Sequence, residues 1–424
     1  MSDQKQPNVR FAGFDDAWEP RKFFNNIKRT IDFRGRTPKK LGMEWSEKGH
    51  LALSALNVKN GYIDKSVNAH YADENLYQKW MTGNELEKGQ VLFTTEAPMG
   101  NVAQIPDNEK YVLSQRTIAF EVLDNEITND FLAVILSSKN VFNRLQTLSS
   151  GATAKGVSQK SLAQLLITVP NSLKEQTRIG IFFKSLDSLI AANQRQLEQL
   201  KTIKKLAMQK IFDQEWRFKG YTDPWEQRKL NEVVNIIDGD RGKNYPHESD
   251  FYNHGDTLFL DTGNVRKNGF NFQTLKYITK YKDSQLQKGK LKIHDFVLTS
   301  RGTLGNLAYY DKDDHGQFPS VRINSAMLIL RPILNNMVSN SFLESVFRGR
   351  IIDLFMKKDH VGSAQPHITK RDFSRVVINI PVNKNEQSSI GLLLKSVNDL
   401  IAANQSKSEQ LKKLKKWFMQ NMFI

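Results

Sequence analysis

Two stretches of the chain, 175–212 and 386–423, place apolar residues at the spacing of a long amphipathic helix. In the first stretch the apolar positions are Ile179, Phe182, Phe183, Leu186, Leu189, Ile190, Leu197, Leu200, Ile203, Leu206, Ala207 and Ile211. In the second they are Ile390, Leu393, Leu394, Val397, Leu400, Ile401, Leu411, Leu414, Trp417, Phe418 and Met422. Pro170 and Pro381 come shortly before the two stretches, where they punctuate the approach to each helix. The pattern predicts two helices of about 35 residues, each roughly 50 Å long.

A striped helix of this length exposes its apolar side to water when it stands alone. The two helices are therefore expected to bury their stripes against each other as a coiled coil. Asn193 and Asn404 interrupt the stripes at equivalent positions. Either a buried amide there fixes the register of the two helices, or both amides simply face solvent. The second stripe is weaker where Ser408 takes the place of Leu197.

The segments outside the helices, about 14–170 and 221–381, predict a mixed α+β structure. Short runs of β-branched and aromatic residues bounded by turn residues predict strands at 91–95, 117–123, 165–170, 257–262, 295–300, 326–332 and 376–381. One helix is expected in each segment, over 131–148 and over 342–358. Gly100–Asn101 and Gly305–Asn306 are expected turns, because glycine tolerates a positive φ.

The chain contains an internal repeat. Residues 10–22 recur at 217–229 with 8 of 13 positions identical, and 175–212 recur at 386–423 with 21 of 38 identical. Between these anchors the two halves diverge, although 91–103 parallels 297–308 and 149–170 parallels 360–381. A shared framework around different interiors is the pattern expected if two similar bodies occupy equivalent places and read different things.

The repeat predicts five segments in an α+β chain. They are an N-terminal tail (1–13), a first globular domain (14–170), a central helix (171–216), a second globular domain (217–381) and a C-terminal helix (382–424). Trp18 and Trp225, which are repeated in the two copies, are expected to pack at the junctions between domain and helix.

The charge of the chain favours a polyanionic partner. Lys and Arg number 61 against 45 Asp and Glu, a net charge of +16, which points to nucleic acid unless it serves general solubility. Lysine clusters at 201–205 and 412–416 place much of the excess on the helices. These clusters either flank a solvated coiled coil or contact phosphates that the protein crosses without reading.

Several function classes are excluded or disfavoured. With no cysteine, disulfides, thiol catalysis and zinc ribbons are impossible, and a cytoplasmic location is compatible. The polar N-terminus predicts no signal peptide, and no apolar run predicts a membrane span. The chain has no GxxxxGK[ST] loop, no Asn/Asp-Pro-Pro-aromatic motif and no metal-ligand spacing among its eight histidines. We therefore expect no catalytic residue, no metal site and no cofactor in this chain.

The repeated segments resemble the specificity subunits of type I restriction-modification systems. The resemblance covers nearly the whole chain and is carried by 217–230, by the IAANQ and EQLK strings of both helix copies and by 295–306. It implies two target-recognition domains in a pseudo-twofold arrangement, joined by an antiparallel coiled coil. Each domain would read one half of a bipartite, asymmetric site in double-stranded DNA. A spacer of roughly 50 Å spans on the order of 15 base pairs and would set the gap between the halves.

The resemblance also implies partners. Two methyltransferase subunits and the restriction subunits, which cleave DNA, would bind this non-catalytic chain and use S-adenosylmethionine, ATP and Mg²⁺ themselves. Two other functions remain open, a self-contained nuclease and a coiled-coil scaffold that binds nucleic acid.

Basic and amide residues in turns or at strand ends are the candidate DNA contacts. Arginine suits guanine, and asparagine or glutamine suits adenine. In the first domain the candidates are Arg34, Arg36, Lys39, Lys40, Gln115, Arg116 and Lys155. In the second they are Arg241, Lys243, Asn264, Arg266, Lys267, Arg301, Arg322, Gln365, Lys370 and Arg371.

Overall fold

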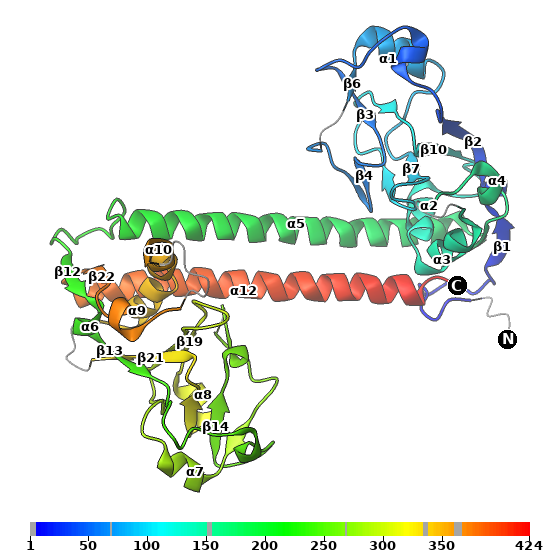
Figure 1. The fold of residues 1–424 in the computed structure, drawn as a ribbon. Helices are drawn as coiled ribbons and strands as arrows, with labels where there is room; N and C mark the ends of the chain where they lie inside the picture. The colour runs from blue at the N-terminus through cyan, green and yellow to red at the C-terminus, as the bar shows by residue number, and fades with distance from the viewer. Residues whose placement is uncertain (1–5, 68–69, 151–154, 268, 334–337, 360–366) are drawn as a thin grey trace. The chain divides into compact units, whose positions relative to one another are not determined.

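The computed structural model describes residues 6–67, 70–150, 155–267, 269–333, 338–359 and 367–424. The chain divides into two compact units. Unit 1 comprises Met1–Gln196 and Asn404–Ile424, and unit 2 comprises Leu197–Ala403. Each unit therefore contains one globular domain and part of each long helix, α5 (Leu173–Phe212) and α12 (Lys384–Asn421) (Figure 1).

Each globular domain is built on a four-stranded antiparallel sheet with the same strand order. In unit 1 the order is β2 (Ile27–Asp32), β10 (Thr117–Val122), β7 (Val91–Thr94) and β8 (Val102–Gln104). In unit 2 it is β13 (Val234–Asp238), β21 (Met327–Pro332), β18 (Phe296–Thr299) and β19 (Leu307–Tyr309). The α+β class predicted from the pattern of apolar runs is confirmed.

Smaller strand groups are also repeated between the domains. In unit 1 they are β1 (Glu19–Lys22) with β11 (Leu166–Val169), β6 (Tyr71–Ala72) with β3 (His50–Leu53) and β9 (Val112–Leu113), and the hairpin β4 (Val58–Lys59) and β5 (Tyr62–Ile63). In unit 2 they are β12 (Glu226–Lys229) with β22 (Val377–Ile380), β17 (Tyr277–Ile278) with β14 (Thr257–Leu260) and β20 (Val321–Ile323), and the hairpin β15 (Val265–Arg266) and β16 (Gly269–Phe270).

The central sheets are buried on both faces, which explains why their strands are continuously apolar. In β7, Val91 and Phe93 join a core shared with the helices, whereas Leu92 between them joins a core on the other face with α1 (Glu74–Met81). Successive side chains of a strand point to opposite faces, so a sheet between two cores needs apolar residues at every position. In β18 of unit 2, Phe296 and Val297 divide in the same way.

The single helix predicted over 131–148 is wrong, because the structure has two. α2 (Asn129–Leu136) stops two residues before α3 (Lys139–Leu148) begins. Between them lies Ser138, whose hydroxyl accepts a hydrogen bond from the Val141 amide and caps α3. The segment 342–358 divides likewise into α9 (Asn340–Phe347) and α10 (Arg350–Asp359). The spacing of apolar residues continues across the capping residue, so the sequence pattern does not show where one helix ends and the next begins.

The helices pack antiparallel within unit 1. Asn193 lies opposite Asn404, Asp187 pairs with Lys415, and the rings of Phe182 and Phe418 are 4.8 Å apart. Residue numbers fall along α5 as they rise along α12, which confirms the direction. In unit 2, Ala207, Met208 and Ile211 of α5 share a core with Ile390 and Leu394 of α12.

Burial along the stripes differs from the expectation. Asn193 is buried and its side-chain nitrogen donates to the Asn404 carbonyl oxygen at 2.9 Å, so this amide does not face solvent. Several predicted stripe residues are instead exposed: Leu189, Ile203, Leu206, Leu393, Leu400, Leu414 and Trp417. A pair of helices covers only one narrow side of each, so a broad stripe leaves apolar residues outside the contact. None of the helices in the described part of the chain combines the length and apolar character that a membrane span requires.

Candidate nucleic-acid interface

An ion pair attaches the first domain to its helix. Glu175, in the first turn of α5, is fully buried and accepts two hydrogen bonds from the Arg10 guanidinium, at 2.6 and 2.7 Å. The indole nitrogen of Trp18 donates to the same carboxylate at 3.3 Å. Glu175 raises the pKa of Arg10, chiefly through these hydrogen bonds. The carboxylate thus has partners for its buried oxygens, as a buried charge requires.

The second domain is attached in the same way. Glu386 of α12 accepts two hydrogen bonds of 2.8 Å from Arg217 and one of 3.4 Å from the Trp225 indole. Trp18 and Trp225 are both buried, so the prediction that they pack at the junctions is confirmed. The structural role of the two glutamates was not predicted, although they stand at matching positions in the repeat.

The next residue of each helix orders a second contact. Gln176 accepts from the Thr128 amide at 2.9 Å and donates to the Pro170 carbonyl at 2.9 Å. Gln387 accepts from the Ser339 amide at 2.7 Å and donates to the Pro381 carbonyl at 2.8 Å. Each glutamine joins the end of the preceding strand to the start of α2 or α9.

A glycine in each long helix permits close packing against these short helices. A Cβ atom on Gly180 would lie 2.5 Å from the Asp130 Cβ, and one on Gly391 would lie 2.5 Å from the Ser341 Cβ. In both units the glutamate, the glutamine and the glycine thus fix the globular domain to its long helix in the same way. We call this set of contacts the mount.

One end of each four-stranded sheet gathers several of the predicted DNA contacts. In unit 1 the end of β2, the start of β10 and the end of β7 lie together, because Asp32 faces Ile118 and Thr94 faces Thr117. In unit 2 the end of β13, the start of β21 and the end of β18 correspond. We call these regions the first and second sheet-end surfaces.

The first sheet-end surface comprises Arg34, Arg116 and Lys155, all exposed. Arg34 pairs with Asp32, and burial alone would raise the pKa of Asp32, but hydrogen bonds from Arg34 and Gln159 lower it. Arg116 pairs with Glu96 at 2.7 Å, and Lys155 precedes Gly156, which bridges to Glu96. Arg116 has φ 67°, an uncommon conformation for a side chain of this size and one often found at functional sites.

The other predicted contacts of the first domain lie in or beside the loop after β2. Arg36 donates to the Trp80 carbonyl at 2.8 Å, with its guanidinium 4.7 Å from the centre of the Phe33 ring, and Gln115 donates to the Arg36 carbonyl at 2.8 Å. These two side chains support the loop. Lys39 and Lys40 are exposed on it, and the Lys40 ammonium donates to Gly35 at 2.6 Å.

The second sheet-end surface comprises Arg241, Arg301, Lys370 and Arg371, all exposed. Arg241 donates to the Ser325 carbonyl at 3.1 Å, and the Arg301 amide donates to the neighbouring Ala326 carbonyl at 3.2 Å. The Ile368 amide donates to Ser300 at 3.0 Å and so places the start of α11 (Lys370–Phe373) beside Arg301. Lys243 is exposed on the loop that follows Arg241.

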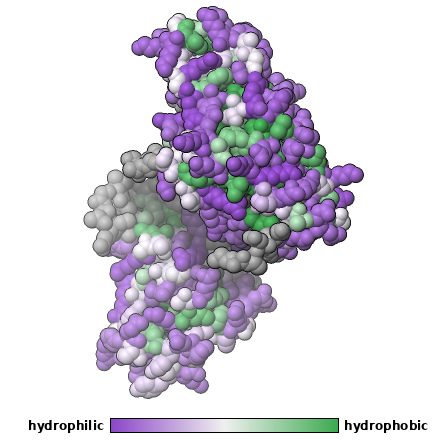
Figure 2. Space-filling model, turned by 90° about the vertical axis from the view of Figure 1, so that its right-hand side faces the viewer, coloured by the Kyte–Doolittle hydropathy of each residue, from purple (hydrophilic) through white to green (hydrophobic). Residues whose placement is uncertain are grey.

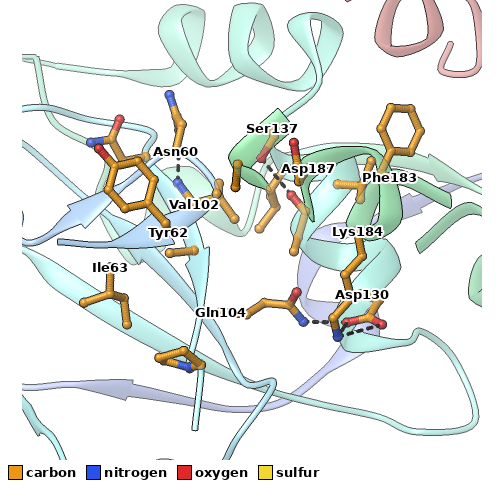
Figure 3. A pocket seen from close by; sticks show the side chains of 18 of the residues that line it. Asn60, Tyr62, Ile63, Val102, Gln104, Asp130, Ser137, Phe183, Lys184 and Asp187 are labelled. Atoms are coloured by element: carbon orange, nitrogen blue, oxygen red, sulfur yellow. Dashed lines mark hydrogen bonds and ion pairs between the residues drawn. The ribbon is translucent and has the colours of Figure 1, made fainter. Parts of the chain in front are cut away.

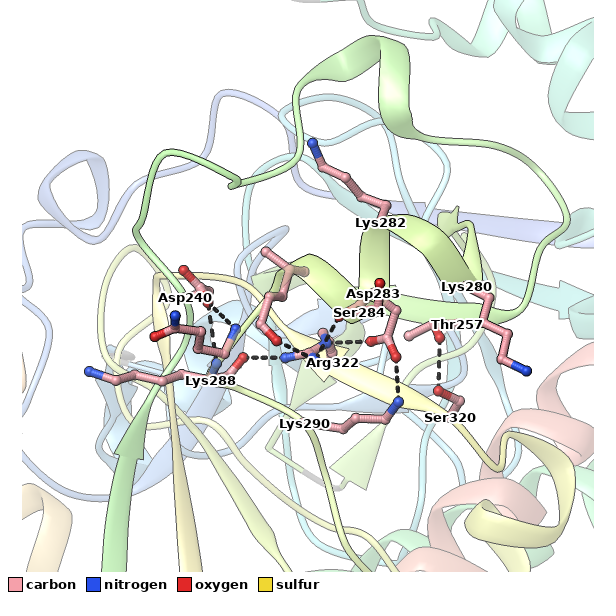
Figure 4. A network of polar contacts seen from close by, with 12 residues as sticks. Asp240, Thr257, Lys280, Lys282, Asp283, Ser284, Lys288, Lys290, Ser320 and Arg322 are labelled. Atoms are coloured by element: carbon pink, nitrogen blue, oxygen red, sulfur yellow. Dashed lines mark hydrogen bonds and ion pairs between the residues drawn. The ribbon is translucent and has the colours of Figure 1, made fainter.

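Two predicted readers of the second domain are interior residues, which corrects the sequence interpretation. Asn264 is buried, and its amide donates to the carbonyls of Asn271 and Thr274. Arg322 is buried among the carbonyls of Asp283, Leu286 and Lys288 and is paired with Asp283 (Figure 4). Both side chains make these contacts in the interior, and sequence cannot distinguish such an arginine from a surface one. Gln365 lies outside the described residues.

The two hairpins are held by equivalent asparagines. Asn101 donates to the Val58 carbonyl at 2.9 Å and Asn306 to the Val265 carbonyl at 3.0 Å. Gly100 and Gly305, which precede them, have φ of 89° and 80°, so both predicted turns are confirmed. The second hairpin carries the exposed Arg266 and Lys267.

In unit 1 the hairpin forms one wall of a cleft of about 1360 Å³. Figure 3 shows Asn60 and Tyr62 of the hairpin on one side, with Lys184 and Asp187 of α5 on the other. The exposed lysines Lys88, Lys139, Lys412 and Lys416 also line it. Over the described residues, no group of three or more His, Asp or Glu side chains could hold a metal ion.

The comparisons with known proteins agree with the repeated architecture. The family profile of the type I restriction modification DNA specificity domain matches residues 35–202 and again residues 222–413. The specificity subunit of the type I restriction enzyme MjaVIII from Methanocaldococcus jannaschii is 25% identical over 334 residues, covering 75% of each chain.

Solved structures share the fold. The S subunit of a type I restriction-modification system from M. genitalium matches over 99% of both chains with a TM-score of 0.65 at 15% identity. A chain from a study of assembly and conformational transition in the type I system matches over 97% of this chain and 99% of its own, with a TM-score of 0.50 at 17% identity. With both halves matched by the same domain, this protein belongs to the type I restriction-modification DNA specificity family.

Proposed function

We propose that this chain is the DNA-recognition subunit of a type I restriction-modification enzyme, and that each sheet-end surface reads one half of a split site in double-stranded DNA. The observation that carries the proposal is that the two domains are fixed to their helices by the same buried contacts but present different exposed residues. Arg34, Arg116 and Lys155 in unit 1 are replaced by Arg241, Arg301, Lys370 and Arg371 in unit 2. Guanidinium groups on exposed loops suit bidentate contacts with guanine and with phosphate. Two different surfaces predict an asymmetric site.

The paired helices suit the role of a spacer between the half-sites. In both units apolar side chains of α5 and α12 share a core, and in unit 1 the buried Asn193 lies in the contact. A polar group at such a contact favours one register. A fixed register between the helices would fix the gap between the half-sites.

Exposed apolar residues at repeated positions support the binding of two copies of one partner subunit. Large apolar side chains that are more than 40% exposed recur 211 residues apart: Leu166 and Val377, Ile181 and Leu392, Leu189 and Leu400, Ile203 and Leu414, Leu206 and Trp417. Each unit contains one member of every pair. Figure 2 shows hydrophobic side chains reaching the surface in separate patches on one face. Equivalent apolar patches are what two identical methyltransferase subunits would need.

Catalysis is assigned to those partners. The methyltransferase subunits would supply the S-adenosylmethionine site, and the restriction subunits would use ATP and Mg²⁺ to cleave DNA. We place the assembly in the cytoplasm. A self-contained nuclease or a coiled-coil scaffold has no observation in its favour.

Methylation mapping tests the function. Genomic DNA from cells that express the methyltransferase subunits is sequenced for methylated adenine, with and without this chain. We expect one bipartite asymmetric motif to be methylated only when the chain is present. Methylation that is independent of the chain, or cleavage of DNA by the purified chain with Mg²⁺, would contradict the proposal.

The partner patches have their own test. Ile181→Asp and Leu392→Asp should each reduce the complex from two methyltransferase subunits to one, measured by native mass spectrometry. The control is Leu56→Asp, because Leu56 is 57% exposed but lies outside the helices. Two bound subunits in both helix variants would refute the assignment of these patches.

A further inference from the structure

The two units differ in charge at one equivalent level of the helix pair. In unit 1, Lys415 of α12 forms an ion pair with Asp187 of α5. With the offset of 211 residues, the matching positions in unit 2 are Lys204 of α5 and Asn398 of α12. An asparagine amide carries no charge, so the second unit has the cation without its acid.

Lys204 stands in an unfavourable environment for a cation. Its side chain is half-buried, and burial lowers its pKa, with a further lowering from the nearby Arg348. Arg348 is already paired with Glu344 at 2.8 Å. Among the side chains that the structure describes, no carboxylate pairs with Lys204. A partly desolvated cation beside a second cation is stabilised by any anion that reaches it.

The surroundings of Lys204 favour a row of anions over a single one. Arg348 donates to the Lys267 carbonyl at 2.9 Å and so holds the hairpin that carries the exposed Arg266 and Lys267. Lys205, the next residue of α5, is exposed. Cations from α5, from the turn after α9 (Asn340–Phe347) and from the hairpin thus lie close to one another. Successive phosphates of a nucleic-acid strand can serve several such cations, whereas one carboxylate serves one.

We propose that Lys204, with Arg348 beside it, binds a backbone phosphate of the DNA in unit 2, and that Asp187 removes the equivalent contact from unit 1. The inference rests on the proposed function and deepens it, because it assigns a contact outside the sheet-end surfaces. Such a contact positions the duplex without reading a base.

The test compares salt dependence across a matched set of variants. The complex of the full chain with its methyltransferase subunits is titrated with a duplex that carries the mapped site, between 0.05 and 0.3 M salt. Lys204→Gln should weaken binding about five-fold at 0.15 M and reduce the slope of log affinity against log salt by about 0.9, the value for one lost phosphate contact. Lys415→Gln, the equivalent change in unit 1, should alter neither quantity.

Exchanging the partner residues supplies the reciprocal test. Asn398→Asp should reproduce the effect of Lys204→Gln, because it builds the ion pair of unit 1 into unit 2. Asp187→Asn should steepen the slope by about 0.9, because it frees Lys415. Thermal unfolding of each variant confirms that it folds.

Three outcomes overturn the inference. The first is an unchanged slope in Lys204→Gln, and the second is an equal change of slope in Lys415→Gln. The third is that Lys204→Gln weakens assembly with the methyltransferase subunits while the slope stays the same, which would assign Lys204 to a protein contact. Failure of the proposed function is distinguishable, because the unmodified complex would then show no preferred site.

Discussion

Unit 1 and unit 2 share what is buried and differ in what is exposed. The mount is the same in both, with Glu175 and Glu386 holding an arginine and a tryptophan at nearly equal distances. A buried carboxylate without a partner is costly, so neither half can change alone. At the partly exposed positions of Asp187 and Asn398 a charge has changed. Burial therefore preserves the repeat, and exposure permits two different surfaces.

The two units also differ in the segments that follow β8 and β19, the second of which contains the short helix α8 (Lys312–Gln317). Burial alone would raise the pKa of Asp107 in unit 1, but hydrogen bonds from Tyr111 and Lys65 lower it. In unit 2, burial and the neighbouring Asp311 raise the pKa of Asp314 to about 6. The contributions of these two carboxyl groups to folding stability therefore change with pH in opposite directions.

The largest effect is expected from exchanging one domain. Replacing residues 14–170 with those of another family member should change one half of the methylated motif completely and leave the other half unchanged, since each sheet-end surface belongs to one unit. Methylation mapping measures both halves. The reciprocal exchange of 217–381 is the control, and a change in both halves from either exchange would contradict the modular reading.

Breaking the mount should be the next largest effect. Arg10→Ala and Arg217→Ala each leave a fully buried glutamate unpaired and should lower the free energy of unfolding by about 3 kcal/mol. Arg228→Ala, at an exposed ion pair with Glu226, should lower it far less, because solvent screens that pair. Scanning calorimetry gives all three values. If only one of the two mount variants is destabilised, the mounts are not equivalent.

Filling the close helix contacts should have a smaller effect. Gly180→Ala and Gly391→Ala place a Cβ against the backbone and side chain of a neighbouring helix, so each should destabilise its unit by about 1–3 kcal/mol. Gly316→Ala, where nothing lies within 4 Å, should be neutral or slightly stabilising. Urea unfolding measures the change in stability of each variant. If Gly391→Ala does not change the stability, the neighbouring helix can move to accommodate the added Cβ.

The smallest effect concerns pH. Because folding raises the pKa of Asp314 to about 6 from an ordinary value of 3.8, the folded state gains stability as the pH falls through 6 and loses it as the pH rises. Asp314→Asn should therefore stabilise unit 2 by about 1 kcal/mol at pH 7.5, after allowance for its partial exposure, and by nothing at pH 3.5. The melting temperature at both values checks this, and equal stabilisation at both would exclude the carboxylate as the cause.

Prediction from sequence was most successful where one local pattern had one structural solution. The turns at Gly100 and Gly305, the buried Trp18 and Trp225 and both long helices are confirmed. It failed where a side chain could face either way. Arg322 and Arg301 are both basic residues beside strands, yet the first is buried against Asp283 and the second is exposed. The acid that pairs with Arg322 lies 39 residues away in the chain, so the residues around each arginine do not show which one is buried.

The amino-acid sequence by itself determined the duplication, the two helices, the α+β class and the family, because each depends on periodicity or identity along the chain. Tertiary structure alone decided which stripe residues stay exposed, which arginines are interior and which of two matching lysines has a partner. These outcomes depend on groups that folding brings together from remote positions, and a charge or an apolar side chain acquires its role only from the neighbours it meets there.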